Sequence, residues 1–295
     1  MTALCRGEPP ATVGHVEQAI TLYDQVRHRS HSAVFGQDPG VACRAFGAVA
    51  LWLIGHPDQA IRQSDAALRL SHELSQPSSQ ALALHFAAML HQCRRDTRRV
   101  LACAEASGAI AAEHGFSFWM AGAAVLRGWA LAMNGAADEG VRLLRQGLHD
   151  WLATGSITYQ TYYLGLLAEV LLRQGQVEEG GAVLEEALAV AGRTGEGLYE
   201  AELHRLRGEL LCGKEMSAAA AARAEGEYRQ ALEIARRQGA RSFELRAAAS
   251  LARLGRCLGR GGEARPLLAE VYGRFTEGLA TPDLQEARAL LDGLP

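Results

Sequence analysis

Few residues in this 295-residue chain have the types and spacing that chemistry requires. His28 and His31 stand three residues apart and Asp38 follows them, so two imidazoles and a carboxylate could in principle ligate a metal ion. They lie in an irregular stretch that offers no further ligand nearby, which favours a loop between the first two repeats, with a partner contact as the alternative. The sequence contains no HExxH, GxSxG or GxGxxG pattern, so no metal or catalytic site is expected.

Phosphate chemistry is equally poorly supported. The single lysine stands in Gly213-Lys214-Glu215, where a phosphate-binding loop would need a hydroxyl residue after the lysine to ligate magnesium. The densest basic run, 94–99, is interrupted by Asp96 and has no interleaved aromatic residues, which favours a solvated turn over an anion or nucleic-acid patch. The acidic pairs Glu178-Glu179 and Glu185-Glu186 are typical of solvated helix surfaces.

Composition and charge narrow the class of protein. Hydrophobic residues make up 48% of the chain, aromatic residues only 6%, and the net charge is −3, so the chain favours helix and lacks the positive field of a nucleic-acid binder. The six cysteines form no CxxC pair, which argues against a disulfide framework or a zinc knuckle. The beginning of the sequence lacks an apolar stretch of signal-peptide length, and no segment is long enough to cross a bilayer, so we expect a cytoplasmic protein with reduced thiols.

A repeat of about forty residues organises the chain. Small residues recur at intervals of 40, 40, 40, 40 and 44 residues, at Ala48, Ala88, Gly128, Ala168, Gly208 and Ala252. Each unit reads as two amphipathic helices joined by a Gly or Pro turn, and the second helices end at glycines. The last interval contains four extra residues, which we expect between the helices in the CGKEMSAAAA stretch.

Glycines inside the predicted helices indicate close packing. A glycine in the middle of a helix costs about 1 kcal/mol relative to alanine. Gly128, Gly140, Gly180 and Gly208 are therefore expected where two helix backbones approach each other too closely for a side chain.

The pattern predicts an all-α fold, a right-handed α-solenoid of about seven helix-turn-helix repeats that resemble tetratricopeptide repeats but are about six residues longer. Residues 1–11 are expected to be a disordered N-terminus, 12–280 the solenoid and 281–295 a C-terminal capping helix. The first unit is incomplete, since Val16 to Arg27 looks like a second helix. Thr281 and Pro282 start the capping helix, whose residues Leu284 to Leu291 would cover the apolar face of the last repeat.

First helices line the concave side of such arrays, which makes their polar positions candidates for partner binding. The usual groove positions of tetratricopeptide repeats are two, five, nine and twelve, counted with the small residue as position eight. They select Trp52, His85, Gln92, Trp129, Tyr162, Glu169, Glu202, Arg205, Glu209, Arg246, Arg253 and Arg256. Acidic residues precede the arginines, so the predicted lining is bipolar, with a basic C-terminal end suited to acidic peptide or phosphate groups.

Several stretches together resemble one known group of proteins. They include YLGLLAEVLLRQGQVEEG (163–180) and YEAELHRLRGELL (199–211), together with 27–60, 126–148 and 271–291. The chain resembles the C-terminal helical-repeat region of bacterial multidomain proteins that join an adenylate or guanylate cyclase domain to an AAA-like signalling ATPase. The resemblance covers residues 14–292 and implies a regulatory region, whose partner would be such a cyclase or ATPase.

The sequence therefore predicts a non-enzymatic scaffold or sensor module that binds a protein or peptide partner, without a cofactor. A regulatory domain that binds a small-molecule effector inside the superhelix is the alternative. An enzyme comes third, because no combination of nucleophile, base and orienting group is visible.

Overall fold

A computed structural model describes residues 1–28, 30–213 and 217–294. The described residues are all-α and contain no strand, which confirms the predicted fold class. Lys214 and its neighbour Glu215 lie outside the described residues.

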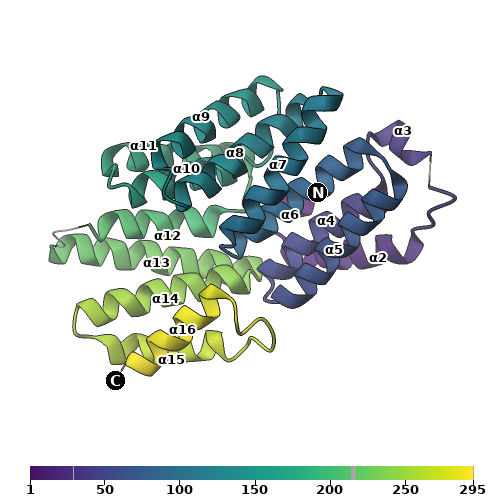
Figure 1. Ribbon diagram of the computed structural model, residues 1–295. Coiled ribbons are helices and arrows are strands. Elements are labelled where there is room, and N and C mark those ends of the chain that lie inside the picture. Colours follow the sequence, from purple (N-terminus) through teal and green to yellow (C-terminus); the bar gives the residue numbers. More distant parts are fainter. Residues whose placement is uncertain (29, 214–216, 295) are drawn as a thin grey trace. The chain divides into compact units, whose positions relative to one another are not determined.

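Helices follow each other in pairs (Figure 1). The first helices of the pairs are α4 (Pro39–Leu53), α6 (Pro77–Cys93), α8 (Ser117–Met133), α10 (Gln160–Arg173), α12 (Glu200–Leu211) and α14 (Arg241–Cys257). The second helices are α5 (Pro57–Leu74), α7 (Thr97–His114), α9 (Ala137–Ala153), α11 (Val177–Thr194), α13 (Ala218–Gln238) and α15 (Gly261–Tyr272). Three shorter or unpaired helices precede them, α1 (Thr2–Cys5), α2 (Pro9–Leu22) and α3 (His31–Phe35), and α16 (Pro282–Gly293) follows.

Glycines end the helices as the sequence predicts. Gly175, inside the α10–α11 pair, and Gly195, between pairs, have φ of 75° and 71°. This left-handed region is costly for residues with a Cβ, so glycine lets the chain reverse there.

Close helix packing is confirmed for the α8–α9 pair. A Cβ on Gly128 would lie 2.7 Å from the carbonyl oxygen of Gly140 and from the amide nitrogen of Leu144. A Cβ on Gly180 would instead meet the side chain of Leu172, and a Cβ on Gly208 would meet the ring of Tyr228. These two glycines make room for a large side chain of the neighbouring helix, and not for its backbone.

Two compact units make up the chain. Unit 1 comprises 1–4, 10–52 and 57–158, and unit 2 comprises 5–9, 53–56 and 159–295. In unit 2, α16 packs its Leu284, Ala287 and Leu290 into one apolar cluster with Leu268 and Val271 of α15. Thr281 precedes this helix, but its side chain makes no capping hydrogen bond.

Two predicted segments differ from the structure. The expected disordered segment 1–11 contains α1 and the start of α2, because Leu4 is fully buried and the carbonyl of Cys5 accepts hydrogen bonds from the backbone of unit 2. Residues 218–221, part of the stretch expected between the helices, instead begin α13, which spans 21 residues where α11 spans 18. Residues 214–216 of that stretch lie outside the described residues. Within the described residues, no helix combines the length and apolar character needed to cross a membrane.

Candidate functional site

The predicted groove residues divide between buried and accessible positions. Eight of the twelve are buried, namely Trp52, His85, Gln92, Trp129, Tyr162, Glu202, Arg205 and Arg246. Glu169 and Arg253 are half-buried, and Glu209 and Arg256 are exposed. On α10, α12 and α14 the positions near the starts of the helices are thus covered and those near their ends reach solvent, whereas on α4 and α6 even Trp52 and Gln92 near the helix ends are buried.

In unit 1 the predicted positions are mainly aromatic and apolar. The His85 ring lies 5.3 Å from the ring of Trp119 and 6.3 Å from that of Trp151, measured between centroids. Burial lowers the pKa of His85 to about 3, because a charged imidazole would be desolvated among these rings. This part of unit 1 is a packed core and offers little chemistry.

In unit 2 the predicted charged residues are brought together on α12. Both the Nε and an Nη nitrogen of Arg205 donate to the same oxygen of Glu202, at 2.9 and 2.6 Å, and another Nη bonds Glu209. Burial by itself would lower the pKa of Arg205, but the carboxylates of Glu202 and Glu209 raise it well above the ordinary value. Arg205 therefore remains charged although only 5% of it is exposed.

Arg246 extends this network from α12 to α14 and α16. Its guanidinium donates to Glu202 at 3.3 Å and to Asp283 at 2.8 Å, and it lies 5.9 Å from the centre of the Phe243 ring. Desolvation opposes its charge, but the carboxylates of Asp283 and Glu202 outweigh that and raise its pKa. We call Glu202, Arg205, Arg246 and Asp283 the buried charge network.

The accessible end of the same helices carries the remaining predicted residues. Arg253 lies about two turns after Arg246 on α14, 3.7 Å from Glu286 of α16, and Arg256 follows it in the last turn. Glu169 of α10 pairs with Arg173 at 3.5 Å. Glu209 lies in the last turn of α12 and pairs with Arg205. We call Glu169, Glu209, Arg253 and Arg256 the accessible edge, which is acidic on α10 and α12 and basic on α14.

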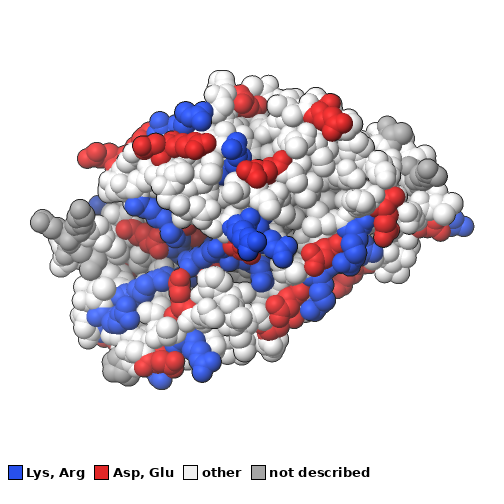
Figure 2. All heavy atoms as spheres, viewed as in Figure 1, with Lys and Arg blue, Asp and Glu red and all other residues white. Residues whose placement is uncertain are grey.

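Charges of both signs are also prominent in the space-filling view. On the face drawn in Figure 2, basic and acidic side chains both gather over the region of α12 to α14. A surface that carries both signs favours a partner that presents charges of both signs.

Sequence reasoning missed three acidic residues of unit 2. Asp283 and Glu286 were counted only as part of a capping helix, yet each faces an arginine of α14. Glu244, with only 4% of its side chain exposed, lies between Arg236 and Arg274 at 2.8 and 3.2 Å. The spacing of three residues between Asp283 and Glu286, which places them on one helix face, was a signal that could have found the first two.

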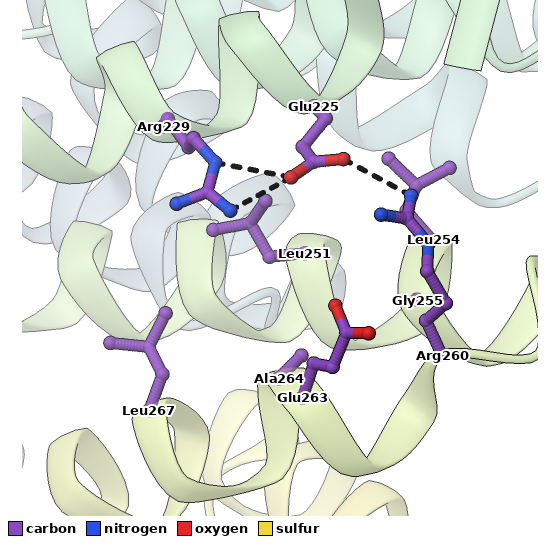
Figure 3. A pocket seen from close by; sticks show the side chains of 9 residues that line it. All are labelled: Glu225, Arg229, Leu251, Leu254, Gly255, Arg260, Glu263, Ala264 and Leu267. Carbon is purple, nitrogen blue, oxygen red and sulfur yellow. Dashed lines mark hydrogen bonds and ion pairs between the residues drawn. The ribbon is translucent and has the colours of Figure 1, made fainter. Parts of the chain in front are cut away.

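A small cavity of unit 2 provides a second candidate (Figure 3). It encloses about 230 Å³ among α13, α14 and α15, with Leu251, Leu254 and Leu267 in its lining. One oxygen of Glu225 accepts from Arg229 at 2.8 Å and the other from Arg260 at 3.2 Å, and these bonds lower the pKa of the carboxyl group. Because the charges at its rim satisfy one another and drug-sized ligands need about 300 Å³ or more, the cavity is a weaker candidate than the accessible edge.

The candidate metal residues serve local structure instead. The Nδ1 atom of His28 accepts from the backbone N–H of Asp24 at 2.9 Å. The carboxylate of Asp38 accepts from the Tyr23 hydroxyl and from the N–H of Val41 at the start of α4. Among residues 1–28, 30–213 and 217–294, no group of three or more His, Cys, Asp or Glu side chains is placed to hold a metal ion.

Comparisons with known proteins bear on the fold. No family model matches the chain. A protein of Rhizobium meliloti strain 1021, described as uncharacterized, is 28% identical over 262 residues, which are 86% of this chain and 24% of that protein. The chain thus spans about a quarter of the length of this curated relative.

Solved structures resemble nearly the whole chain. NprR in complex with its cognate peptide NprX has a TM-score of 0.60 at 14% identity, with 96% of this chain and 81% of that chain covered. The apo form of the quorum sensor NprR from B. thuringiensis has a TM-score of 0.54 at 15% identity, covering 95% and 80%. The apo form of RapI has a TM-score of 0.58 at 12% identity, covering 86% and 84%. The chain therefore has the tetratricopeptide-like helical-repeat fold of these proteins.

Proposed function

We propose that this chain is a non-catalytic scaffold or sensor module that binds a peptide or protein segment through the accessible edge of unit 2. The observation that carries the proposal is the division of charge on the first helices. Glu202, Arg205, Arg246 and Asp283 neutralise one another inside, whereas Arg253 and Arg256 reach solvent beside them. Buried ion pairs that hold the first helices together can keep the accessible charges of the same helices in place at a small entropic cost.

The signs of the accessible charges define the partner's chemistry. Acids on α10 and α12 suit a basic group, and the two arginines on α14 suit a carboxylate or phosphate group. The partner segment would therefore carry an acidic residue at the end that lies over α14. NprR has a similar fold and was solved with a bound peptide, which supports a peptide as the class of ligand.

Regulation of a cyclase or signalling ATPase is the finer part of the proposal. It rests on the resemblance of residues 14–292 to the repeat region of such bacterial proteins. The relative from Rhizobium meliloti is about four times as long as the matched segment, so a related region lies within a larger protein there. We propose that a cyclase or AAA-like ATPase is the companion of this module.

Selection from a phage-displayed library of random twelve-residue peptides tests the proposal on the full chain. We expect enriched peptides that carry acidic residues and that bind the purified chain with micromolar or tighter affinity. A thermal-shift screen against a metabolite library runs in parallel, because a ligand bound to the native state raises the melting temperature. No enriched peptide, together with a metabolite that raises the melting temperature, would replace this function by small-molecule sensing.

A further inference from the structure

In unit 2, residues 5–7 pack against the loop between α11 and α12 in the way that a bound peptide packs against its binding site. Residues 5–9 belong to unit 2 by their contacts, and residues 6–8 form no helix. The carbonyl oxygen of Cys5 accepts hydrogen bonds from two successive backbone N–H groups, of Gly197 at 2.9 Å and of Leu198 at 3.1 Å. Cys5 is the last residue of α1 and residues 6 and 7 form a turn, so these two adjacent N–H groups bind the carbonyl at the end of a helical turn.

The loop that makes these bonds is itself held in place. Glu196 accepts a hydrogen bond from the N–H of Thr161 in the first turn of α10, at 3.1 Å. On the other side, the Nε2 atom of Gln238, the last residue of α13, donates to the carbonyl of Gly197 at 2.8 Å. The loop between α11 and α12 is therefore anchored to α10 and α13 as well as to residues 5–7.

Close packing between the backbones of Gly7 and Gly197 restricts which residue can stand at position 7 of the bound segment. Gly7 has φ of 74°, and a Cβ there would lie 2.6 Å from Gln238 Nε2 and 2.9 Å from the Gly197 carbonyl. Opposite it, a Cβ on Gly197 would lie 2.6 Å from the carbonyl oxygen of Arg6. Two glycines thus face each other, and only a glycine fits at the third residue of the segment.

The side chain of the first residue of the segment is partly covered. The Cys5 thiol is partly buried beside the Tyr159 hydroxyl, and burial raises the pKa of the thiol. Arg6 is exposed and makes its close contact through its carbonyl, so its side chain is not selected.

We propose that the loop 196–198, with Tyr159 and Gln238, is a second peptide-docking site, which the chain's own Cys5-Arg6-Gly7 segment occupies in the structure. Its ligand class is a peptide that leaves a helical residue through a turn and has a left-handed glycine two positions on, as Cys5-Arg6-Gly7 does. The site is distinct from the accessible edge and does not require the proposed function, because it contains none of the edge residues.

Release of the segment in the full chain tests this site. In Gly7→Val, a β-branched residue would be forced into left-handed backbone without space for its side chain, so we expect residues 5–7 to leave the loop. The probes are the maleimide labelling rate of Cys5, followed by peptide mass spectrometry, and the anisotropy of a labelled peptide TALCRGEPP, which copies residues 2–10. Gly14→Val is the matched control, since nothing lies within 4 Å of a Cβ at that position.

The proposal predicts that Gly7→Val raises the Cys5 labelling rate at least tenfold and binds the peptide. Wild type and Gly14→Val should bind it at least tenfold more weakly, because their own segment competes at high effective concentration. Adding Gly197→Val to Gly7→Val should abolish binding. An unchanged Cys5 rate, or a released segment with no peptide binding at millimolar concentration, would overturn the proposal. Loss of the helical circular dichroism in both Gly7→Val and Gly197→Val would overturn it too, by showing that the segment is part of the core.

Discussion

Arg246 of α14 donates to Asp283 of α16 at 2.8 Å, with only 7% and 13% of the two side chains exposed. The pair joins the last repeat to its capping helix at the point where the apolar contacts of Leu284 and Ala287 begin. The capping helix therefore completes the charge network of the first helices in addition to covering an apolar face.

Loss of this pair should destabilise the chain. In Asp283→Asn, Arg246 loses the carboxylate at 2.8 Å and keeps Glu202 at 3.3 Å, and breaking a buried ion pair costs about 3 kcal/mol. Urea denaturation followed by circular dichroism measures the change. Asp292→Asn on the same helix is the control, because Asp292 pairs with Arg288 at 4.0 Å and about three quarters of both side chains are exposed. Equal stability of the two variants would show that the network contributes nothing.

Stability should fall in mild acid because of His85. Its folded-state pKa of about 3 lies below the ordinary value of 6.5, so between these values the unfolded chain binds a proton that the native chain does not. The contribution of His85 is present above pH 6.5 and is lost as the pH falls, by about 2 kcal/mol between pH 6.5 and 5. Urea denaturation at pH 7 and pH 5, followed by tryptophan fluorescence, should show this extra loss in wild type and not in His85→Leu. The same pH dependence in both would mean that His85 is accessible to protons in the native state.

Two glycines should respond to alanine with opposite signs. Gly128→Ala places a Cβ against the backbone of α9 and should cost about 1 to 3 kcal/mol. Gly226→Ala, inside α13, meets nothing within 4 Å and should stabilise by about 0.5 to 1 kcal/mol through helix propensity. Thermal unfolding of the two variants compares them directly. A stabilising Gly128→Ala would contradict the close approach of α8 and α9.

Sequence periodicity predicted the helix pairs and their glycine turns because both depend on local chemistry. It also placed Glu202 and Arg246 at the same position of two successive first helices, with Arg205 three residues after Glu202. It could not predict that these three would be buried, since their burial depends on how α12, α14 and α16 pack and on Asp283, which lies 81 residues after Glu202. The N-terminal helix was missed for the same reason, because Cys5 is held by Gly197, which is remote in sequence.

The affinity of a library-selected acidic peptide for Arg253→Ala/Arg256→Ala, measured by fluorescence anisotropy, tests the central claim most directly. The control is Arg237→Ala/Arg265→Ala, which removes two exposed arginines from the second helices α13 and α15. Charge-assisted hydrogen bonds contribute about 1.5 to 3 kcal/mol, so the account predicts a Kd at least about tenfold higher for the first variant. It also predicts an unchanged Kd for the control and unchanged circular dichroism for both. Equal affinities in the two variants would contradict binding at the accessible edge.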